Sequence, residues 1–454
     1  MTAVIVIPRG LARSVRALAR KCVSGRPRGP APPVVFGVAA GTLTAWARAD
    51  DAALVYSAPA HGGDARLVVP MPVLEAVEGG GDDPVELAVG PGLRGEARWA
   101  DGGVSRTHPF DAILPGKQHR PPDPPDAWHP APEGLLAALH ECGRAVARDA
   151  GRYALSRVQV RGRAGQVVAT DGRTALLQSG FSFPFAENVL VPALPVFGSR
   201  ELAAGRQVRI GQTTTHLVVG AGPWQVYLLL DRSGRYPDVA GVVPGSAPTV
   251  AEIGPADAAV LVDRLPGLPG AGADHRPVTL VLDRGVAVLA RDEQSGRVER
   301  VRLDGSAVSG PPARVAVDRR ALALGCNTVR VSAPGRPVVV AGGNVTLVTV
   351  ALTPPAAVDH PEEIDLPPPD APERRSVVKP DPTVHPPEAR PDPPGEDVPD
   401  LLAAAEGLRA AVVDAVAKAG RLVTALKARR PDPRALARAW AAVKALPLGP
   451  GGGP

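Results

Sequence analysis

Two kinds of hydrophobic periodicity alternate along most of this chain. Between residues 9 and 23 apolar residues recur at three- and four-residue spacing, with Leu11, Val15 and Leu18 on one face of a predicted helix. From residue 153 to residue 160 apolar and polar residues alternate instead, so one face of a predicted strand is buried. The pattern predicts a chain that mixes amphipathic helices with strands.

The same order of elements occurs three times, with a period of about 120 residues. Each copy begins with a strand and a helix, continues with strands, and adds a second helix and further strands. The predicted helices span residues 9–23, 72–77, 132–150, 196–203, 255–264 and 318–324. This order predicts an α+β protein of three repeated modules, each with two helices packed on antiparallel sheets. The expected boundaries are 1–118 for module 1, 119–131 for a linker, 132–245 for module 2 and 246–355 for module 3.

The last hundred residues have a different composition. Residues 356–398 are rich in Pro, Asp, Glu and Arg and have few large apolar side chains, so we expect a disordered tether. From residue 399, apolar residues such as Leu401, Leu408 and Val412 return at helical spacing, and Pro431 and Pro433 interrupt it. A helical hairpin is therefore expected at 399–446, followed by a disordered end at 447–454.

Charge and cysteine usage exclude several classes of protein. The formal net charge of +5 permits a polyanionic partner without requiring one. Cys22, Cys142 and Cys326 are far apart and belong to no Cys/His cluster, which favours reduced thiols over disulfides or a zinc site. No apolar run has membrane-spanning length, and no signal sequence is recognisable. We expect a cytoplasmic protein that does not contact a membrane.

No catalytic constellation is recognisable in the sequence. It has no Gly-x-x-x-x-Gly-Lys-Ser/Thr loop, no His-Glu-x-x-His and no Gly-x-Ser-x-Gly. The histidines do not have the spacing of metal ligands. We expect a protein that is not an enzyme and that needs neither a metal nor a cofactor.

Two motifs in module 2 point to a known family. Residues 151–176 contain Arg-Tyr-x-Leu, a strand, and then Ala169-Thr170-Asp171-Gly172, where Asp-Gly suits a tight turn. Alone, this reads as an ordinary hairpin. About sixty residues later comes Gly-Arg-Tyr-Pro-Asp at 234–238. Both motifs, in this order and spacing, resemble the bacterial DNA polymerase sliding clamp, the β subunit, and the resemblance covers residues 1–355.

The resemblance implies a fold and a set of partners. In that family the helices of each module line a central hole, the sheets lie outside, and six modules close a ring. Three modules per chain therefore imply a homodimer in which module 1 of one copy meets module 3 of the other. The implied partners are double-stranded DNA, a DNA polymerase and a clamp loader. An alternative is a clamp-fold paralogue that acts as a protein–protein scaffold and does not encircle DNA.

The DNA-binding residues that the resemblance implies are basic side chains on the predicted helices, together with one arginine in an Arg-Pro turn. They are Arg13, Arg16, Arg20, Lys21, Arg26, Arg144, Arg148, Arg200, Arg264, Arg319 and Arg320. Such side chains would contact phosphates and read no bases, which would let a ring slide. For any single helix, a basic stripe is also explained as a solvated face.

The resemblance also implies an apolar pocket between modules 2 and 3 that accepts short peptides from partner proteins. It falls on Leu155, Thr170, Gly172, Arg173, Thr174, Ala175, Pro237, Val242, Leu352 and Pro354. The chain departs from the family there, because Ala175 replaces a leucine and Gly241 an arginine. It also continues past the strand with which the family ends. We hypothesise that the tail either blocks this pocket or recruits a separate partner.

Overall fold

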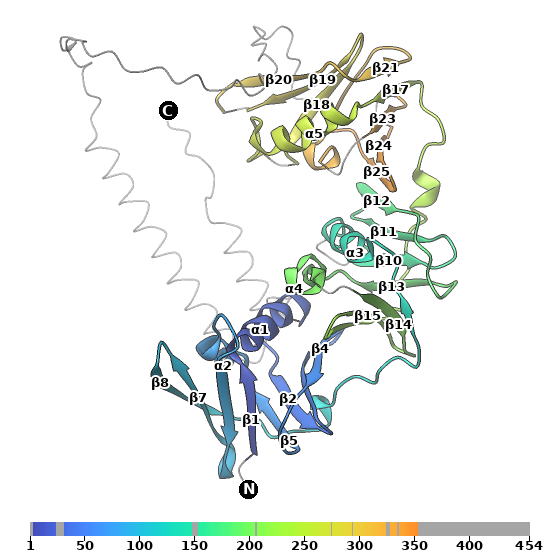
Figure 1. Ribbon diagram of the computed structural model, residues 1–454. Coiled ribbons are helices and arrows are strands. Elements are labelled where there is room, and N and C mark those ends of the chain that lie inside the picture. The colour runs from blue at the N-terminus through green and yellow to red at the C-terminus, as the bar shows by residue number, and fades with distance from the viewer. Residues whose placement is uncertain are drawn as a thin grey trace, which may run out of the picture. The chain divides into compact units, whose positions relative to one another are not determined.

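The structure, a computed structural model, describes residues 3–23, 31–147, 153–204, 207–273, 275–292, 294–323, 327–333 and 336–352. The expected tether at 356–398, the expected helical hairpin at 399–446 and the end at 447–454 lie outside the described residues. The described part contains the three predicted modules (Figure 1), and each module consists of two half-modules. Every half-module has one strand, then a helical part and then three strands, and the first half of module 3 adds a fourth, the short β21 (Ala307–Ser309).

Module 1 contains two full α-helices. Its elements are β1 (Ala3–Pro8), α1 (Arg9–Val23), β2 (Val34–Ala39), β3 (Thr42–Arg48) and β4 (Ala52–Pro59), then β5 (Ala65–Val69), α2 (Met71–Val77), β6 (Pro84–Val89), η1 (Pro91–Leu93), β7 (Arg94–Asp101) and β8 (Val104–Asp111). The bounds of α1 are those predicted from its apolar spacing, and Leu11, Val15, Leu18 and Cys22 on that face are all buried. Burial of this face is what holds the helix on the sheets.

Module 2 repeats the order with shorter helical segments. After η2 (Lys117–His119) its elements are β9 (Trp128–Pro130), α3 (Leu135–Arg144), β10 (Arg157–Arg161), β11 (Gln166–Thr170) and β12 (Thr174–Gln178), then β13 (Asn188–Pro192), η3 (Pro195–Gly198), α4 (Arg200–Ala203), β14 (Val208–Gln212), β15 (His216–Ala221) and β16 (Trp224–Leu229). The strand β9 occupies part of the expected linker at 119–131. The helix predicted at 196–203 is instead a turn of 3₁₀-helix and a single α-turn that meet at Ser199.

Module 3 has the shortest second helical segment. After η4 (Ala240–Val242) its elements are β17 (Thr249–Glu252), α5 (Pro255–Arg264), η5 (Leu265–Gly267), β18 (Pro277–Leu282), β19 (Val286–Arg291), β20 (Val298–Leu303) and β21 (Ala307–Ser309), then β22 (Ala313–Asp318), η6 (Arg319–Ala321), β23 (Thr328–Val331), β24 (Val338–Gly342) and β25 (Val345–Thr349). Within the described residues, the helix predicted at 318–324 is only the 3₁₀ turn η6, which Asp318 caps by accepting from the Arg320 N–H. The Asp318 side chain thus satisfies one of the N–H groups that the start of a helix leaves without a partner.

The two halves of every module exchange their first strands. Sheet A has the order β1-β6-β7-β8, and sheet D has the order β20-β19-β18-β22. Sheet B (β5-β2-β3-β4-β16-β15-β14-β9) and sheet C (β13-β10-β11-β12-β25-β24-β23-β17-β21) are longer. In each case the first strand of one half lies beside the second strand of the other half, as β1 lies beside β6 and β5 beside β2. Both halves therefore share one core.

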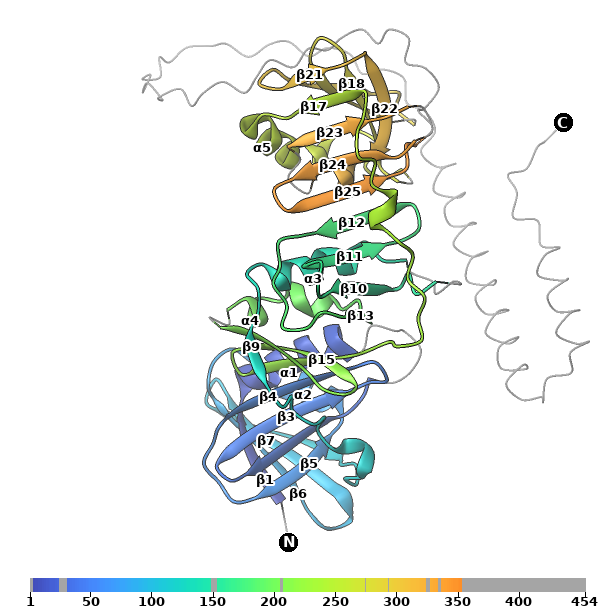
Figure 2. The ribbon, with the colours of Figure 1, turned by 90° about the vertical axis from the view of Figure 1, so that its right-hand side faces the viewer.

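Modules join by pairing strands across their boundary (Figure 2). In sheet B, β4 of module 1 pairs antiparallel with β16 of module 2, where Tyr56 faces Trp224 with ring centroids 4.8 Å apart. In sheet C, β12 of module 2 pairs antiparallel with β25 of module 3, and Thr174 faces Thr349. At both boundaries, the last strand of the first half of one module pairs with the last strand of the second half of the next. Both module boundaries therefore follow the same strand-pairing rule.

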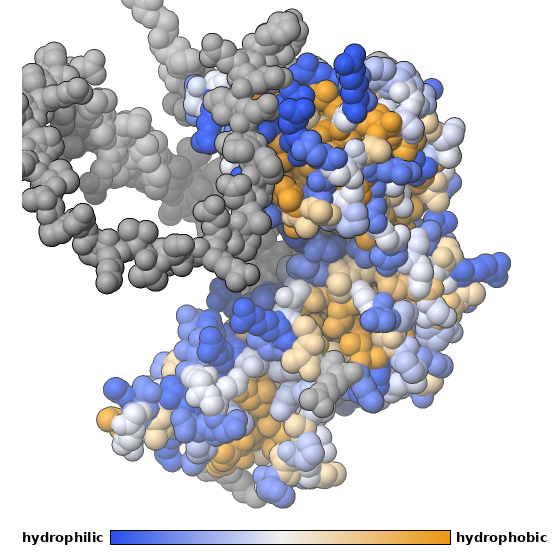
Figure 3. All heavy atoms as spheres, turned by 45° about the horizontal axis from the view of Figure 1, so that its top comes forward, coloured by the Kyte–Doolittle hydropathy of each residue, from blue (hydrophilic) through white to orange (hydrophobic). Residues whose placement is uncertain are grey.

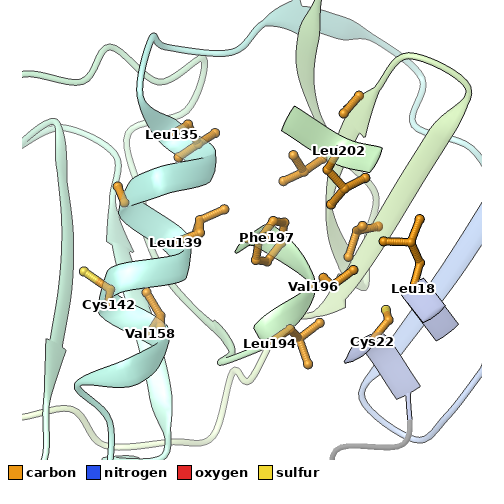
Figure 4. Packing of buried hydrophobic residues seen from close by; sticks show 14 of the residues in the cluster. Leu18, Cys22, Leu135, Leu139, Cys142, Val158, Leu194, Val196, Phe197 and Leu202 are labelled. Atoms are coloured by element: carbon orange, nitrogen blue, oxygen red, sulfur yellow. The ribbon is translucent and has the colours of Figure 1, made fainter. Parts of the chain in front are cut away.

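The helical segments of modules 1 and 2 also meet. On one side of η3, Val196 lies near the buried residues Leu18 and Cys22 of α1. On the other side, Phe197 of η3 faces Leu139 of α3 (Figure 4). Burial raises the pKa of the Cys22 thiol well above its usual range, and burial raises that of Cys142 in the same way. The two cysteines therefore act as small apolar core residues.

Connecting segments cover the outer faces of the two long sheets, which are the faces turned away from α1 and α3. On sheet B, an apolar cluster that includes Trp46 lies beneath residues 112–127, and the Trp46 indole N–H donates to the His119 carbonyl at 3.1 Å. On sheet C, Tyr236 and Val239 of the segment 231–248 pack over Val168 and Ala175. Each connection leaves one module, crosses a sheet face and enters the next module.

Candidate nucleic-acid interface and peptide pocket

The basic stripe predicted on α1 is present, and part of it is exposed. Arg13, Arg20 and Lys21 are exposed on this helix. The Lys21 ammonium donates to the Ser199 hydroxyl of module 2 at 3.1 Å, so it lies where the two modules meet. Together with Arg9 and Arg16, these residues give α1 five basic side chains, and the helix contains no acidic one. The exposed members can meet a polyanion.

Arg16 is committed inside module 1. Its guanidinium makes two hydrogen bonds to the Glu78 carboxylate, just after α2, and lies 3.6 Å from Glu75. The hydrogen bonds to Glu78 raise the pKa of Arg16 further above its usual value. Because its charge is already compensated, Arg16 ties α1 to α2 and has little charge left for DNA.

Modules 2 and 3 contribute less free positive charge than the sequence led us to expect. Arg144, Arg200 and Arg264 are exposed at the ends of α3, α4 and α5, and Arg144 lies 3.7 Å from Glu141. Arg320 is exposed but makes a two-pronged contact with Asp318, which raises its pKa. Arg26 and Arg148 lie outside the described residues.

Arg319 corrects the sequence interpretation, because its side chain faces the interior of module 3. It is 4% exposed, and its guanidinium donates to the carbonyls of Leu265, Leu268, Pro269 and Arg276 at 2.5–3.1 Å. Burial lowers its pKa from the usual value. The carbonyls of Leu265, Leu268 and Pro269 lie at the end of α5 and in the turn after it, and that of Arg276 lies just before β18. Arg319 therefore holds this connection together and cannot reach a phosphate outside.

The net charge of the helices is therefore unequal along the chain. α1 carries five basic side chains, α3 pairs Glu141 with Arg144, and α4 contains one acid, Glu201, and one base, Arg200. In α5, Asp257 and Asp263 outnumber Arg264. Positive charge on the helices is concentrated in module 1.

A cavity of about 640 Å³ lies beside the basic residues of module 2. Leu136 and His140 of α3 line one side, and Phe197, Ser199 and Arg200 line the other. The ring of His140 packs against Gly198, where a Cβ would lie only 2.5 Å from the ring. His140 Nδ1 is buried and makes no hydrogen bond within the described part of the chain. The mixed lining of this cavity, with Glu133 and Glu141 beside Arg200, does not favour an anion over a cation.

The turn at the centre of the expected peptide pocket has the geometry that its sequence predicts. Gly172 has a φ of +89°, and Asp171 Oδ1 accepts from the N–H groups of Arg173 and Thr174 at 2.9 and 2.7 Å. Thr170 is buried, and its hydroxyl accepts from the Gly172 N–H at 3.0 Å. A positive φ and an Asx turn are the reasons that Asp and Gly stand here.

The fold brings most of the expected pocket residues together. A Cβ on Gly172 would lie 3.6 Å from Leu155, and the Thr174 hydroxyl lies 3.3 Å from that of Thr349. The Arg173 carbonyl accepts from the N–H of Val350, which is 46% exposed. Leu155 and the end of β25 therefore adjoin the same turn, although they are far apart in sequence.

The remaining pocket residues differ in exposure. Ala175 is buried beneath the segment 231–248, so it belongs to the floor and offers no open surface. Pro237 is half-buried, and Val242 is 52% exposed on η4. Leu352 bridges to Ala316, and Pro354 lies outside the described residues.

One neighbour of the pocket escaped the sequence interpretation. Arg173 Nη1 lies 3.2 Å from His275 Nε2 of module 3. His275 has a φ of +60° and lies in a loop about a hundred residues away. No local pattern marks it, because the two loops belong to different modules, which the pairing of β12 with β25 joins.

Two classes of site are not found in the described part of the chain. No group of three or more His, Cys, Asp or Glu residues is placed there to hold a metal ion. None of the described helices is long and apolar enough to cross a bilayer.

Comparison with known proteins identifies the fold. No protein-family model and no curated protein matches the sequence. Among solved structures, the DNA polymerase III subunit beta of Pseudomonas aeruginosa matches with a TM-score of 0.59 at 16% identity, over 78% of this chain and 100% of that one. The subunit of Thermotoga maritima matches with 0.61 at 14%, also over 78% and 100%. That of Borrelia burgdorferi matches with 0.62 at 11%, over 77% and 98%.

These similarities cover 77–78% of this chain and 98–100% of the matched chains. At such low identity they establish architecture and not individual residues. The chain has the fold of the bacterial DNA polymerase III beta subunits, the sliding clamps.

Proposed function

We propose that this protein is a DNA sliding clamp: a processivity factor without catalytic chemistry that encircles duplex DNA as a homodimer in the cytoplasm. It would be opened by a clamp loader and would tether a polymerase or a repair protein. The observation that carries the proposal is the rule by which modules join, because that rule leaves two complementary sheet edges at the ends of the three-module array.

The two edges follow from the pairing of β4 with β16 and of β12 with β25. Two strands that close a half in this way remain at a sheet edge: β8 in module 1 and β20 in module 3. The short β21 that follows β20 pairs with β17 in sheet C. By the rule, β20 pairs antiparallel with β8, and this pairing requires the β8 of a second copy. A two-fold dimer made in this way closes six modules into a ring and covers both edges, which would otherwise be open to aggregation.

The outward N–H groups of β8 limit how a second strand can pair at this edge. The register of β7 with β8, and the bond from the Ala112 N–H to the Leu93 carbonyl, turn the N–H groups of Ser105, Thr107 and Asp111 toward the free edge. Pro109 occupies the remaining outward position and has no N–H to offer. Pairing at this edge therefore depends on few donors, and Thr107 lies in the middle of them.

Thr107→Pro tests the ring without disturbing the pairing of β7 with β8. The substitution removes only one outward N–H. The dimer dissociation constant measured by analytical ultracentrifugation should therefore be at least tenfold larger for Thr107→Pro than for Thr107→Ala, which keeps the N–H. A wild-type protein that sediments as one chain at every concentration would contradict ring closure.

DNA contact is proposed for the exposed basic residues of α1. In the proposed ring, Arg13, Arg20 and Lys21 of both copies face the hole and meet phosphates, while Arg144, Arg200 and Arg264 add weaker contacts. A ring that surrounds DNA stays on a closed circle and slides off a linear duplex. Retention of the protein on nicked circular plasmid after loading, and its loss when the plasmid is linearised, is the expected result.

The scaffold alternative has one observation in its favour, which is the acidic balance of α5. With Asp257 and Asp263 against Arg264, the helix α5 of module 3 offers DNA no net attraction. A scaffold that does not encircle DNA would give equal retention on circular and linear DNA, or none on either. It would still bind partner peptides at the turn around Gly172.

A further inference from the structure

The outer face of sheet D is basic. Strand register places Arg302, Ala287, Val281 and Arg314 in one row across the four strands. The next row contains Arg300, Leu289, Thr279 and Ala316, and beyond it the pairs Val298–Arg291 and Pro277–Asp318 lie on the same face. Within the strands of sheet D, four arginines thus share this face with one carboxylate, Asp318, which Arg320 engages. The opposite face carries the buried core residues Val278, Leu280, Val288 and Val317.

This face combines positive charge with apolar patches. Arg302 and Arg314 are exposed on the outer strands, and Leu289 and Val281 are half-buried between them. Thr279, Ala287 and Ala316 form a buried floor. In the view of Figure 3, strongly hydrophilic residues likewise lie next to hydrophobic ones on module 3. Arg291 Nε is buried and makes no hydrogen bond within the described residues. A buried donor of this kind calls for an acceptor.

The corresponding faces of sheets B and C are each crossed by the segment that leaves the preceding module. Residues 112–127 follow β8 and cross sheet B, and residues 231–248 follow β16 and cross sheet C. The segment that follows β25 is next in this series. It starts toward sheet D, because the Leu352 N–H donates to the Ala316 carbonyl of β22 at 2.8 Å and the two residues form an antiparallel bridge.

The sequence after Leu352 complements the basic face. Residues 353–373 contain no lysine or arginine and carry Asp359, Glu362, Glu363, Asp365, Asp370 and Glu373. Val358, Ile364 and Leu366 are interspersed among the acids. Beyond this stretch Arg374, Arg375 and Lys379 end the run of negative charge. An acidic segment with spaced apolar residues matches a face on which arginines surround Leu289 and Val281.

The length of chain is sufficient. Crossing from β22 to β20 takes three strand spacings, or ~14 Å. The seven residues from Leu352 to Asp359 reach up to ~23 Å when extended. The acids from Asp359 to Asp365 can therefore lie over Arg300, Arg302 and Arg314. Because the segment is covalently attached, its effective concentration at this face is ~10⁻³ M. Ion pairs that are individually weak are therefore enough to hold the segment on the face.

We propose that residues 359–366 bind in cis to the outer face of sheet D through their carboxylates, on Arg291, Arg300, Arg302 and Arg314. The segment would occupy the place on module 3 that residues 112–127 and 231–248 occupy on the two long sheets. The rest of the tail would then leave from the outer side of the protein. The face is occupied by the protein's own chain and is not a second DNA-binding surface.

Hydrogen exchange of the full-length chain, followed by mass spectrometry, tests this interaction. The variant carries Asp359→Asn, Glu362→Gln, Glu363→Gln and Asp365→Asn. A matched control neutralises four acids farther along the tail, with Asp381→Asn, Glu388→Gln, Asp392→Asn and Glu396→Gln. In the first variant, we expect amides of β20, β22 and residues 359–366 to exchange about tenfold faster than in the wild type, as the loss of several exposed ion pairs implies. The control should exchange like the wild type.

A charge exchange makes the test specific. Arg302→Glu with Arg314→Glu should also speed exchange, and adding Glu362→Lys with Glu363→Lys should restore part of the protection. Unchanged exchange in the first variant, equal effects in the control, or a failure of the second pair to restore protection would overturn the proposal. If a 20-base-pair duplex protected β20 and β22 of the wild type without displacing residues 359–366, the face would be a nucleic-acid site instead.

Discussion

Arginine has three different roles in this protein, and its surroundings decide which one a given residue has. Arg319 is buried and satisfies four carbonyls, Arg16 is half-buried and holds a carboxylate, and Arg13 is exposed. All three stand in helical segments and look alike in the sequence. Only an arginine of the third kind keeps a charge that a phosphate can use.

Replacing Arg319 should destabilise module 3 without a direct effect on DNA. Arg319→Met leaves the carbonyls of Leu265, Leu268 and Pro269 buried without a donor, so the free energy of unfolding should fall by about 3 kcal/mol or more. Urea denaturation measures this. Arg320→Met, at the neighbouring exposed position, should cost less than about 1 kcal/mol. Equal losses would show that the buried guanidinium has no special role.

His216 should make the fold sensitive to mild acid. Burial and then the nearby charge of Arg48 lower its pKa in the folded protein. The unfolded chain therefore binds the proton more readily. Stability should be complete above pH 6.5 and fall below it, down to the lower folded pKa, with a slope of at most about 1.4 kcal/mol per pH unit.

The control for this prediction is His216→Gln, which keeps a polar side chain beside Thr215 but does not titrate. Urea midpoints measured from pH 7.5 to pH 5 should decline less steeply for the variant than for the wild type. Parallel curves for the two proteins would assign the acid sensitivity to other groups.

At the scale of elements, much was predictable from the sequence because it depends on local pattern. The apolar spacing of Leu11, Val15 and Leu18 defined α1, and Asp171-Gly172 defined a turn that needs a positive φ. The shortened helices after Pro195 and Asp318 were not predictable from periodicity, since a few apolar residues fit either one turn or two.

The parts of the candidate sites that could not be predicted all depend on contacts between distant segments. Arg16 is 62 residues from Glu78, and Arg173 is 102 residues from His275. Local spacing gives the face of a helix on which Arg16 lies, but not which carboxylate lies opposite. The sequence thus located the surfaces better than it identified the residues that are free to act there.

The contact between α1 and α2 is open to a double-mutant cycle. Arg16→Ala and Glu78→Ala should each lower the free energy of unfolding, and the double variant should lose less than the sum, with a coupling of about 1 kcal/mol for a half-buried two-pronged pair. DNA affinity should hardly change in Arg16→Ala. A loss of DNA affinity as large as that of Arg13→Ala would mean that Arg16 leaves Glu78 to bind DNA.

At the scale of the whole molecule, the charge distribution predicts an unequal contribution of the modules to DNA binding. Replacing Arg13, Arg20 and Lys21 by Gln should reduce the slope of log K against log salt concentration by roughly 0.9 for every phosphate that these side chains no longer neutralise, summed over both copies. Fluorescence anisotropy with a short duplex at several salt concentrations measures the slope. Arg264→Gln should change it far less, because two acids already offset that arginine in α5.

The comparison variant for this experiment is Arg94→Gln. Arg94 is highly exposed but lies on β7, away from the helices, and pairs with Asp111. An equal change of slope for Arg94 and for the α1 residues would indicate diffuse attraction to the whole protein and would remove the helices as the DNA-facing surface.

The exchange of first strands between half-modules limits how such a protein can grow or be divided. Since β1 completes the sheet of the second half and β5 completes that of the first, neither half alone has a finished sheet. Gene duplication or domain transplantation would therefore have to copy the halves in pairs. A cut between β4 and β5 would yield two fragments that bind one another rather than two independent folding units.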